Sequence, residues 1–397
     1  MNELILRNYE ISKLSIDYPT VTNIVILGFL LIISLLWTQK QSTRFLDRDQ
    51  TDQLRGGSIL LVIMTHLWQH VSAVEASPHL SGYGVSMFLF ISGFALTSTL
   101  DKPTFTWSRF LFRRLRRMMV PYWALTVVWL FADYFLLHRT YTLRDITYTF
   151  AGINIRPISD IDYVRWYITW IIMWYFAFAA GNRFLSNYGA MLSIFGFGIV
   201  LLVLRVMEAI PLVSHPIHML TFPLGMLLAT YRRNVTAWLS GPQTRLLMVF
   251  GTASLVLLSS GLVLLTWGSA GNSKAVSTIF GGGAQLAWCV VFAMAVAALG
   301  RYGYVSKFLK SWGTVSYGAF LIHGPLLIKY NPIMGLFPGY AVVISFPLFL
   351  AMVWILAFFL HSFLDHMWKW MDNHSQSTER LRALEPADLN VRTVDGS

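Results

Sequence analysis

Charge is scarce in this sequence, and cysteine is nearly absent. Lys, Arg, Asp and Glu make up only 12% of the 397 residues, whereas soluble domains carry about 25%. A soluble protein with so little charge would need a very large buried core, so the composition disfavours one. The single cysteine, Cys289, excludes an intramolecular disulfide framework and a zinc site built from cysteines.

Acidic residues are also outnumbered, which raises the question of a nucleic-acid partner. The formal net charge is +11, but the basic residues lie between apolar runs instead of forming one face. This arrangement is typical of membrane topology and not of phosphate-backbone binding. We therefore expect no nucleic-acid partner and expect contact with membrane lipids.

Many apolar runs are long enough to cross a bilayer, which needs about 20 residues per helix. Hydrophobic residues make up 55% of the chain and aromatic residues 15%. We predict an all-α integral membrane protein with about eleven transmembrane helices. The predicted spans are 21–38, 56–74, 83–100, 118–137, 164–181, 189–207, 217–231, 246–267, 282–300, 313–330 and 341–362.

The segments around these spans are short, and no soluble domain is predicted. The first span, 21–38, follows a mixed-charge segment at 1–20 and lacks a small-residue cleavage pattern, so we interpret it as a retained transmembrane helix. The tail at 372–397 is polar and has no aromatic residues, which predicts disorder.

Lys and Arg are unevenly divided between alternate loops. The loops after the first, third, fifth, seventh and ninth spans hold seventeen of them, against six in the opposite set. Because basic residues accumulate in cytoplasmic loops, we predict an extracytoplasmic N-terminus and a cytoplasmic C-terminus.

Arg55 and His66 are the most informative pair of residues. The ten residues between them, GGSILLVIMT, are uncharged. On an α-helix this spacing is three turns plus about 20°, so both side chains share one face about 16 Å apart. Ionisable groups inside a membrane are costly and indicate function, and histidine is the usual general base near neutral pH.

Two other interpretations of His66 stay open. A buried histidine can simply hydrogen-bond to a neighbouring carbonyl. His70 follows at i+4 and could form a metal pair with His66, but no Glu completes an HExxH motif, so we expect no metal.

Five arginines crowd the segment WSRFLFRRLRRMMVPYW at 107–123. Such clusters are often topogenic or attract anionic lipid headgroups. Their density also fits a polyanion, because guanidinium groups bind phosphate with two bonds. The candidates for cofactor binding are Arg113, Arg114, Arg116 and Arg117.

Two further motifs combine small and polar residues. Gly84 to Phe94 includes Ser92 and Gly93, which allow close helix packing. Ser316 and His323 lie two turns apart on one helix face, followed by Pro325, which loosens the helix. His323 could bind substrate or cap the kinked backbone.

Together these motifs resemble the acyltransferase-3 family of bacterial membrane acyltransferases, which modify cell-envelope sugars and lipids. The resemblance covers about residues 50–365, with 21–38 as an addition to the usual ten helices. It is carried by Arg55 and His66, by Gly84 to Phe94, and by the Arg-Arg…Arg…Pro-Tyr-Trp segment that ends in Tyr122 and Trp123. Weaker matches are Trp166, Phe222–Gly225, Ser316-Tyr317 and His323.

The resemblance implies an acyl-CoA-dependent O-acyltransferase with no tightly bound cofactor. Acyl-CoA, most commonly acetyl-CoA, would place its phosphates on the arginine segment and Arg55, and its arm would extend towards His66. The acceptor would be a hydroxyl of a saccharide or a lipid-linked sugar. Ser86 and Ile171 stand where many relatives have acidic residues, so the sequence identifies no carboxylate partner for His66.

Two different functions remain as alternatives. A transporter or flippase for a lipid-linked glycan or an acyl compound would use the histidines for proton relay. A non-catalytic membrane scaffold would leave Arg55 and His66 without a role.

Overall fold

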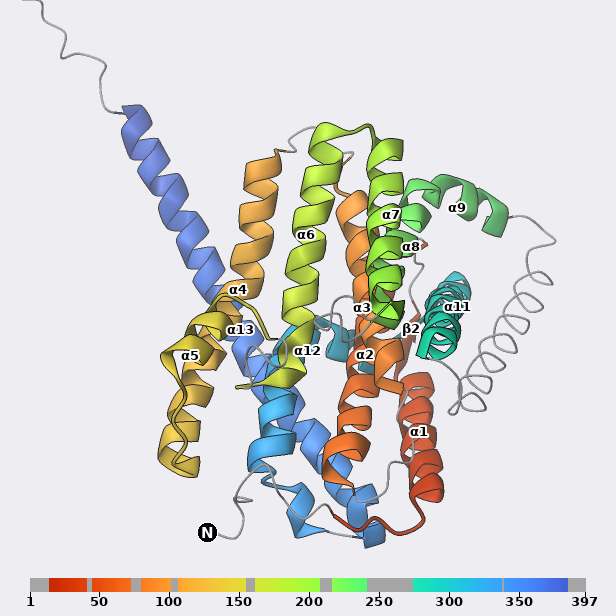
Figure 1. Cartoon of the computed structure of the whole chain (residues 1–397), viewed down its shortest axis with the longest axis vertical. Helices are drawn as coiled ribbons and strands as arrows, with labels where there is room; N and C mark the ends of the chain where they lie inside the picture. The colour runs from red at the N-terminus through yellow and green to blue at the C-terminus, as the bar shows by residue number, and fades with distance from the viewer. Residues whose placement is uncertain are drawn as a thin grey trace, which may run out of the picture.

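The computed structural model describes residues 14–40, 45–72, 80–100, 106–154, 161–207, 216–240, 274–337 and 339–384. These residues form a mostly helical protein with one two-stranded sheet (Figure 1). The longer helices are α1 (Pro19–Leu36), α2 (Arg48–His66), α3 (Leu80–Thr97), α4 (Trp107–Leu137), α6 (Trp166–Phe184), α7 (Asn187–Val206), α11 (Lys274–Arg301), α12 (Lys307–Pro325) and α13 (Val342–Leu384).

Shorter elements connect them. These are the strands β1 (Thr38–Lys40) and β2 (Tyr304–Ser306), the helices α5 (Leu143–Phe150), α8 (Thr221–Thr230) and α9 (Arg232–Ser240), the π-helical turns η1 (Leu67–Val71) and η4 (Leu326–Tyr330), and the 3₁₀ turns η2 (Tyr163–Arg165), η3 (Pro216–His218), η5 (Met334–Leu336) and η6 (Gly339–Ala341).

Each predicted span in the described residues overlaps a helix, whereas 246–267 lies outside them. Within the described ranges, five helical stretches are long and apolar enough to cross a membrane: Pro19–Leu36, Phe110–Leu137, Asn187–Leu204, Thr278–Arg301 and Gly339–Met371. The count of about eleven is therefore not confirmed. The central helix α2 is less apolar because it carries Arg48, Asp49, Asp52 and Arg55 in its first half.

The buried face of the first helix is mostly polar, and its exposed face is apolar. In α1 the buried residues are Thr22, Asn23, Ile26 and Ser34. Leu31 and Leu35 are among the large apolar residues that it exposes. This distribution suits a helix with one face in contact with lipid.

Helix α2 lies at the centre of the structure, packed against α12 and α3. Glycines bring the backbones together: a Cβ on Gly56 would overlap the Leu309 carbonyl group, and one on Gly313 would overlap the Asp52 carbonyl oxygen. Small residues allow such close approach in membrane helix pairs. No side chain separates α2 from α12 at this point. The C-terminal ends of the same two helices also lie close together.

Helices α3 and α8 pack in the same way. A Cβ on Gly93 would overlap the carbonyl oxygen of Phe222, and one on Gly225 would overlap that of Phe90. The packing role predicted for Gly93 is thereby seen in the structure. The same contacts give Phe222–Gly225 a packing role, because Gly225 fits against the backbone of α3.

Contacts at the helix ends join loops that the alternating topology assigns to the same side. Strand β1 pairs antiparallel with β2, which joins the segments after α1 and α11. The backbone N–H of Leu14 donates to the Val71 carbonyl, and that of Gly339 donates to the Ser15 carbonyl. The N-terminal segment therefore lies with the ends of η1 and the segment before α13, which belong to the same predicted set of loops.

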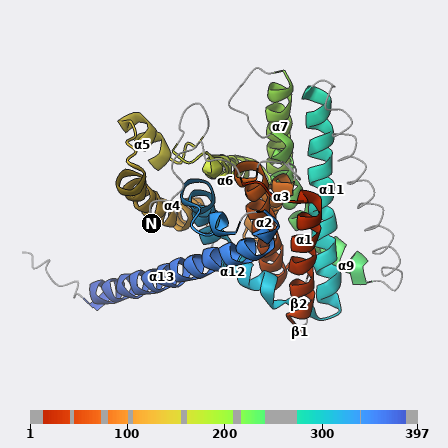
Figure 2. The same cartoon turned by 90° about the horizontal axis from the view of Figure 1, so that it is seen from below.

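The C-terminal helix continues further than predicted. Helix α13 runs to Leu384 and projects away from the other helices (Figures 1 and 2). The prediction of disorder from residue 372 is therefore wrong for 372–384. This stretch is polar but includes Glu, Arg, Leu and Ala, which are strong helix formers. Residues 385–397 lie outside the described part.

Candidate functional site

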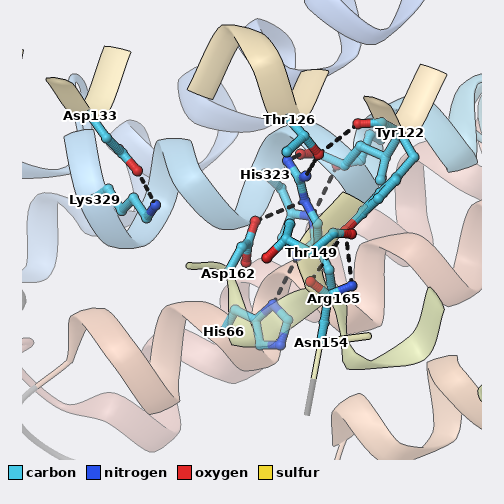
Figure 3. Close-up of polar contacts among 12 residues, drawn as sticks. His66, Tyr122, Thr126, Asp133, Thr149, Asn154, Asp162, Arg165, His323 and Lys329 are labelled. Atoms are coloured by element: carbon cyan, nitrogen blue, oxygen red, sulfur yellow. Dashed lines mark hydrogen bonds and ion pairs between the residues drawn. The ribbon is translucent and has the colours of Figure 1, made fainter. Parts of the chain in front are cut away.

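The imidazoles of His66 and His323 meet in the interior. His66 Nδ1 lies 2.8 Å from His323 Nε2, and the ring planes are nearly parallel, 3° apart. Both rings are buried, with residue exposures of 8% and 0%. Figure 3 shows the pair with the polar residues around it. The two strongest histidine candidates from the sequence therefore form one site.

The hydrogen-bond network assigns the tautomers of the pair. His323 Nδ1 lies 2.9 Å from the Ala319 carbonyl oxygen, so this nitrogen carries the donated proton. A neutral His323 then accepts at Nε2, and His66 must donate from Nδ1. The lone pair of a neutral His66 consequently resides on Nε2, the arrangement that a general base needs.

Both histidines come just before a change in helix type. Residues 67–71 after His66 form the π-helical turn η1, and residues 326–330, just after Pro325, form η4. These two turns also contact each other. Proline lacks a backbone N–H, and π-turns are frequent at functional sites.

A buried arginine that the sequence did not single out holds the backbone next to His323. Arg165 Nη1 donates to Thr126 Oγ1 at 2.8 Å, and Nη2 donates to the Leu321 carbonyl oxygen at 3.3 Å. Its Nε lies 2.8 Å from Asp162 Oδ2, and the guanidinium is almost fully buried (Figure 3). Asp162 thus holds the Arg165 guanidinium, which binds α12 two residues before His323.

Tyr122, part of the motif that carries the family resemblance, forms hydrogen bonds to the protein through its hydroxyl. The hydroxyl donates to the Thr149 carbonyl oxygen at 2.6 Å and also contacts the Asn154 side chain. The Arg165 guanidinium lies 5.3 Å from its ring centroid. These contacts connect α4 to α5 and to the Arg165 network.

Arg55 and two tyrosines of α6 lie between the arginine segment and the histidines. Tyr167 and Tyr175 both lie near the Ser92 hydroxyl, and both lie close enough to Arg55 to interact electrostatically. Tyr175 also interacts with Arg114. Protein atoms surround both tyrosines, yet each keeps part of its surface accessible.

The far end of this group reaches the histidines through aromatic contacts. The Tyr167 ring lies 5.5 Å from the Phe320 ring, which lies 5.9 Å from the His323 imidazole. Arg114, Tyr175, Ser92, Tyr167 and Phe320 therefore form a continuous line of neighbours ending at His323. We call these residues the interior column.

Arg55 is held at its end of the helix by a buried carboxylate. Arg55 Nη1 donates to Asp52 Oδ1 at 2.8 Å. Burial raises the pKa of the Asp52 carboxyl, and the attraction of Arg55 opposes that rise. Arg55 stays partly exposed, so one side of its guanidinium still faces solvent.

The arginines of α4 point in different directions. The Arg114 guanidinium packs over Phe110 on the same helix, and Arg113 and Arg117 are exposed. The Arg116 guanidinium lies 4.6 Å from the Trp368 ring of α13. Arg116 therefore faces away from the interior column, unlike Arg114.

The remaining candidates occupy varied positions. Tyr317 donates to the Met118 carbonyl oxygen of α4 at 2.7 Å, and Ser316 bonds to the Gly313 carbonyl oxygen of its own helix. The Trp166 ring stacks on the imidazole of His218. His70 has no described side chain, and in the described ranges no group of three or more His, Cys, Asp or Glu residues could hold a metal ion.

Comparison with known sequences identifies a family for this chain. The sequence profile Acyl_transf_3, described as an acyltransferase domain, matches residues 48–362. The chain belongs to the acyltransferase-3 family. Searches of curated proteins and of solved structures returned no match. The matched range holds both histidines, the interior column and the arginine segment, and it leaves α1 outside. The protein is therefore a transferase of a membrane acyltransferase family, and α1 precedes the matched range.

Proposed function

We propose that the protein is an O-acyltransferase of the bacterial cytoplasmic membrane. It would move an acyl group, most simply acetyl, from cytoplasmic acyl-CoA to a hydroxyl of a cell-envelope saccharide or lipid-linked sugar. The observation that carries the proposal is the His66–His323 pair, joined by the interior column to Arg55 and Arg114.

The donor end of the site uses charge. Acyl-CoA carries phosphates, which bind guanidinium groups with two bonds each. Arg113, Arg114 and Arg117 occupy an arc of about 100° on α4, and Arg55 is partly exposed near the same column. The phosphates would stay at this end while the arm lies against Tyr175 and Tyr167.

The chemistry would take place at His66 Nε2. This nitrogen takes the proton of the acceptor hydroxyl while the hydroxyl oxygen forms a bond to the thioester carbonyl carbon. The carbon–sulfur bond then breaks, and CoA leaves as the thiol with the proton that His66 returns. His323 holds the Nδ1–H of His66 throughout, and the dry interior limits hydrolysis of the thioester.

The first experiment uses purified full-length protein with labelled acetyl-CoA. We expect binding of acetyl-CoA and His66-dependent release of CoA in the presence of sugar acceptors. His66→Ala should lower this turnover about 100-fold or more, the usual contribution of a general base, with donor binding retained. His366→Ala is the matched control, because His366 lies exposed on α13.

The arginine segment is tested by replacements that keep its charge. Arg113→Lys and Arg117→Lys should weaken acetyl-CoA binding, because lysine cannot form the bidentate contact. Arg183→Lys, at an exposed arginine of α6, serves as control. Equal binding by all three variants would leave the segment with a topogenic role. Absence of acetyl-CoA binding by the wild-type protein would reject the proposal and favour transport.

A further inference from the structure

A third buried histidine belongs to a polar cluster that the scheme above does not use. His218 Nδ1 lies 2.7 Å from Ser86 Oγ, and the Trp166 ring stacks on the imidazole with 5.7 Å between centroids. His218 and Ser86 are both fully buried. The serine that replaces an acidic residue of many relatives is therefore the hydrogen-bond partner of this histidine.

Helix α11 adds an amide to the same cluster. A Cβ on Gly82 would lie 2.7 Å from Gln285 Nε2 and 3.4 Å from His218 Cε1. Both side chains thus lie over the Gly82 backbone. The next residue, Tyr83, places its ring 5.2 Å from that of Trp288, which is one turn after Gln285 on α11.

Two polar atoms of α11 lack partners here. Gln285 Oε1 and Trp288 Nε1 are both buried without a hydrogen bond, and Gln285 is only 3% exposed. Residues three apart share a helix face. Unpartnered indoles recur in the described residues, at Trp68, Trp129, Trp170 and Trp174. At Trp288, however, the free donor is one turn from a free acceptor.

Such a pair matches a hydroxyl group, which donates and accepts at once. A buried amide oxygen without a partner is costly, and a bound water, ion or ligand group is one way in which such an atom is satisfied. A sugar hydroxyl would donate to Gln285 Oε1 and accept from the Trp288 indole. The nearby rings of Trp166 and Tyr83 suit the apolar faces of a pyranose.

A series of neighbouring residues links the cluster to the histidine pair. Trp166 contacts His218, and the next residue, Tyr167, contacts Phe320, which contacts His323. Gly84 packs against Val62, one turn before His66 on α2. Several residues of the cluster lie just after predicted extracytoplasmic loops. These are Gly82 near the start of α3, Trp166 at the start of α6, and His218 in η3.

We propose that Ser86, His218, Gln285, Trp288 and Trp166 form a binding site for a saccharide group that reaches it from the extracytoplasmic side. This inference rests on the proposed acyltransferase function and identifies the place where the sugar acceptor binds. Ser86 fixes the imidazole of His218, and Gln285 and Trp288 bind a sugar hydroxyl.

Binding is measured on the full-length protein, labelled with 5-fluorotryptophan, in lipid nanodiscs. The probes are methyl β-D-glucoside and N-acetylglucosamine, with tetrahydropyran as a ring that lacks hydroxyls. The Trp288 resonance, assigned by its loss in Trp288→Phe, should shift saturably with at least one sugar and not with tetrahydropyran. Gln285→Ala should weaken this binding about tenfold, as loss of a hydrogen bond predicts.

Trp129→Phe is the matched control, because it removes another unpartnered buried indole that stacks on Tyr330 instead. It should leave the sugar-dependent shift unchanged. A resonance that stays constant with both sugars, or that shifts equally in Gln285→Ala, would overturn the site. In that case the two orphan atoms bind structural water only.

Kinetics separate this inference from the function on which it rests. Gln285→Ala and Trp288→Phe should raise the KM for the sugar about tenfold and leave the KM for acetyl-CoA unchanged. Wild-type transfer activity with no change in either variant would overturn the saccharide site alone. A protein that neither binds nor turns over acetyl-CoA would overturn the proposed function, whatever the sugar-dependent shift.

Discussion

His323 touches the proposed base but stands one residue away from the reacting atoms. Its Nε2 accepts from His66 Nδ1, and its own Nδ1 is held by the Ala319 carbonyl. This makes His323 a positioning residue, whose task is to keep the lone pair of His66 on Nε2. Arg165 stabilises the backbone next to His323 by donating to the Leu321 carbonyl oxygen.

Two replacements of His323 test this task. Glutamine can place an acceptor oxygen near the position of Nε2, whereas leucine cannot. We expect His323→Leu to lower kcat about 100-fold, as loss of general-base function does, and His323→Gln to recover a large part of it. The KM for acetyl-CoA should change little in either variant, because the proposed phosphate site lies elsewhere.

Thermal stability of both His323 variants is the control for folding. A structural role alone would lower kcat and stability together and would not distinguish glutamine from leucine. Equal kcat values for two stable variants would therefore contradict the positioning role.

A second buried charge pair lies apart from the histidines. Lys329 Nζ lies 2.6 Å from Asp133 Oδ2 (Figure 3). The hydroxyls of Tyr141 and Tyr330 donate to the same carboxylate. Removing one partner leaves an uncompensated buried charge, which costs about 3–5 kcal/mol. Lys329→Met should therefore lower the apparent melting temperature in detergent strongly.

The double variant Asp133→Asn/Lys329→Met should recover most of that loss, because no lone charge remains. Melting temperatures of the two single variants and the double variant measure the coupling. Additive losses would show that the two side chains do not stabilise each other.

The sequence identified those candidate residues whose side chains differ in polarity from their neighbours. An ionisable residue within an apolar run, as at His66 and His323, stands out by contrast. Their direct contact could not be found, since 257 positions separate them and no local pattern reports a tertiary pairing. Arg165 was missed because it begins a helix beside a polar loop, where an arginine looks like an ordinary flanking charge.

Among the elements, α2 and α12 bring the two histidines together because glycines fix the distance between the helices. A Cβ on Gly313 would overlap the Asp52 carbonyl oxygen, whereas Gly28 of α1 has nothing within 4 Å of its Cβ position. Gly313→Ala must therefore separate α2 from α12, and overpacking costs about 1–3 kcal/mol.

We expect Gly313→Ala to lower both the melting temperature and turnover, because the shift is passed on to His66. Gly28→Ala should have little effect or stabilise α1 slightly, since alanine is the better helix former. Thermal shift and turnover of the two variants check this. Equal melting temperatures would show that the α2–α12 contact tolerates a methyl group.

Helix positions followed from apolar runs, but details of the elements did not. The length of each apolar run indicated a membrane-spanning helix, and the predicted spans therefore overlap helices. The π-turns η1 and η4 contact each other although they are distant in sequence, and no local pattern predicted either turn. The α13 extension to Leu384 was missed because a polar composition was taken as disorder, although its residues favour helix.

At the scale of the whole molecule, the loops fall on two sides. Ser15 and Gly339 are joined by a backbone hydrogen bond, and β1 joins β2 near the start of α12. Every step of the proposed reaction depends on which side is cytoplasmic, because acyl-CoA must reach Arg114 and the sugar must reach the opposite end.

Single cysteines can determine the sidedness. Cys289 is fully buried and gives little background with a membrane-impermeant maleimide. Ser15 and Ser108 are exposed, and Ser108 lies on the arginine segment. Because basic segments stay in the cytoplasm, Ser15→Cys should be labelled in intact cells, and Ser108→Cys only after permeabilisation. The reverse pattern would place the arginine segment outside the cell, where acyl-CoA is absent, and would exclude the proposed direction of transfer.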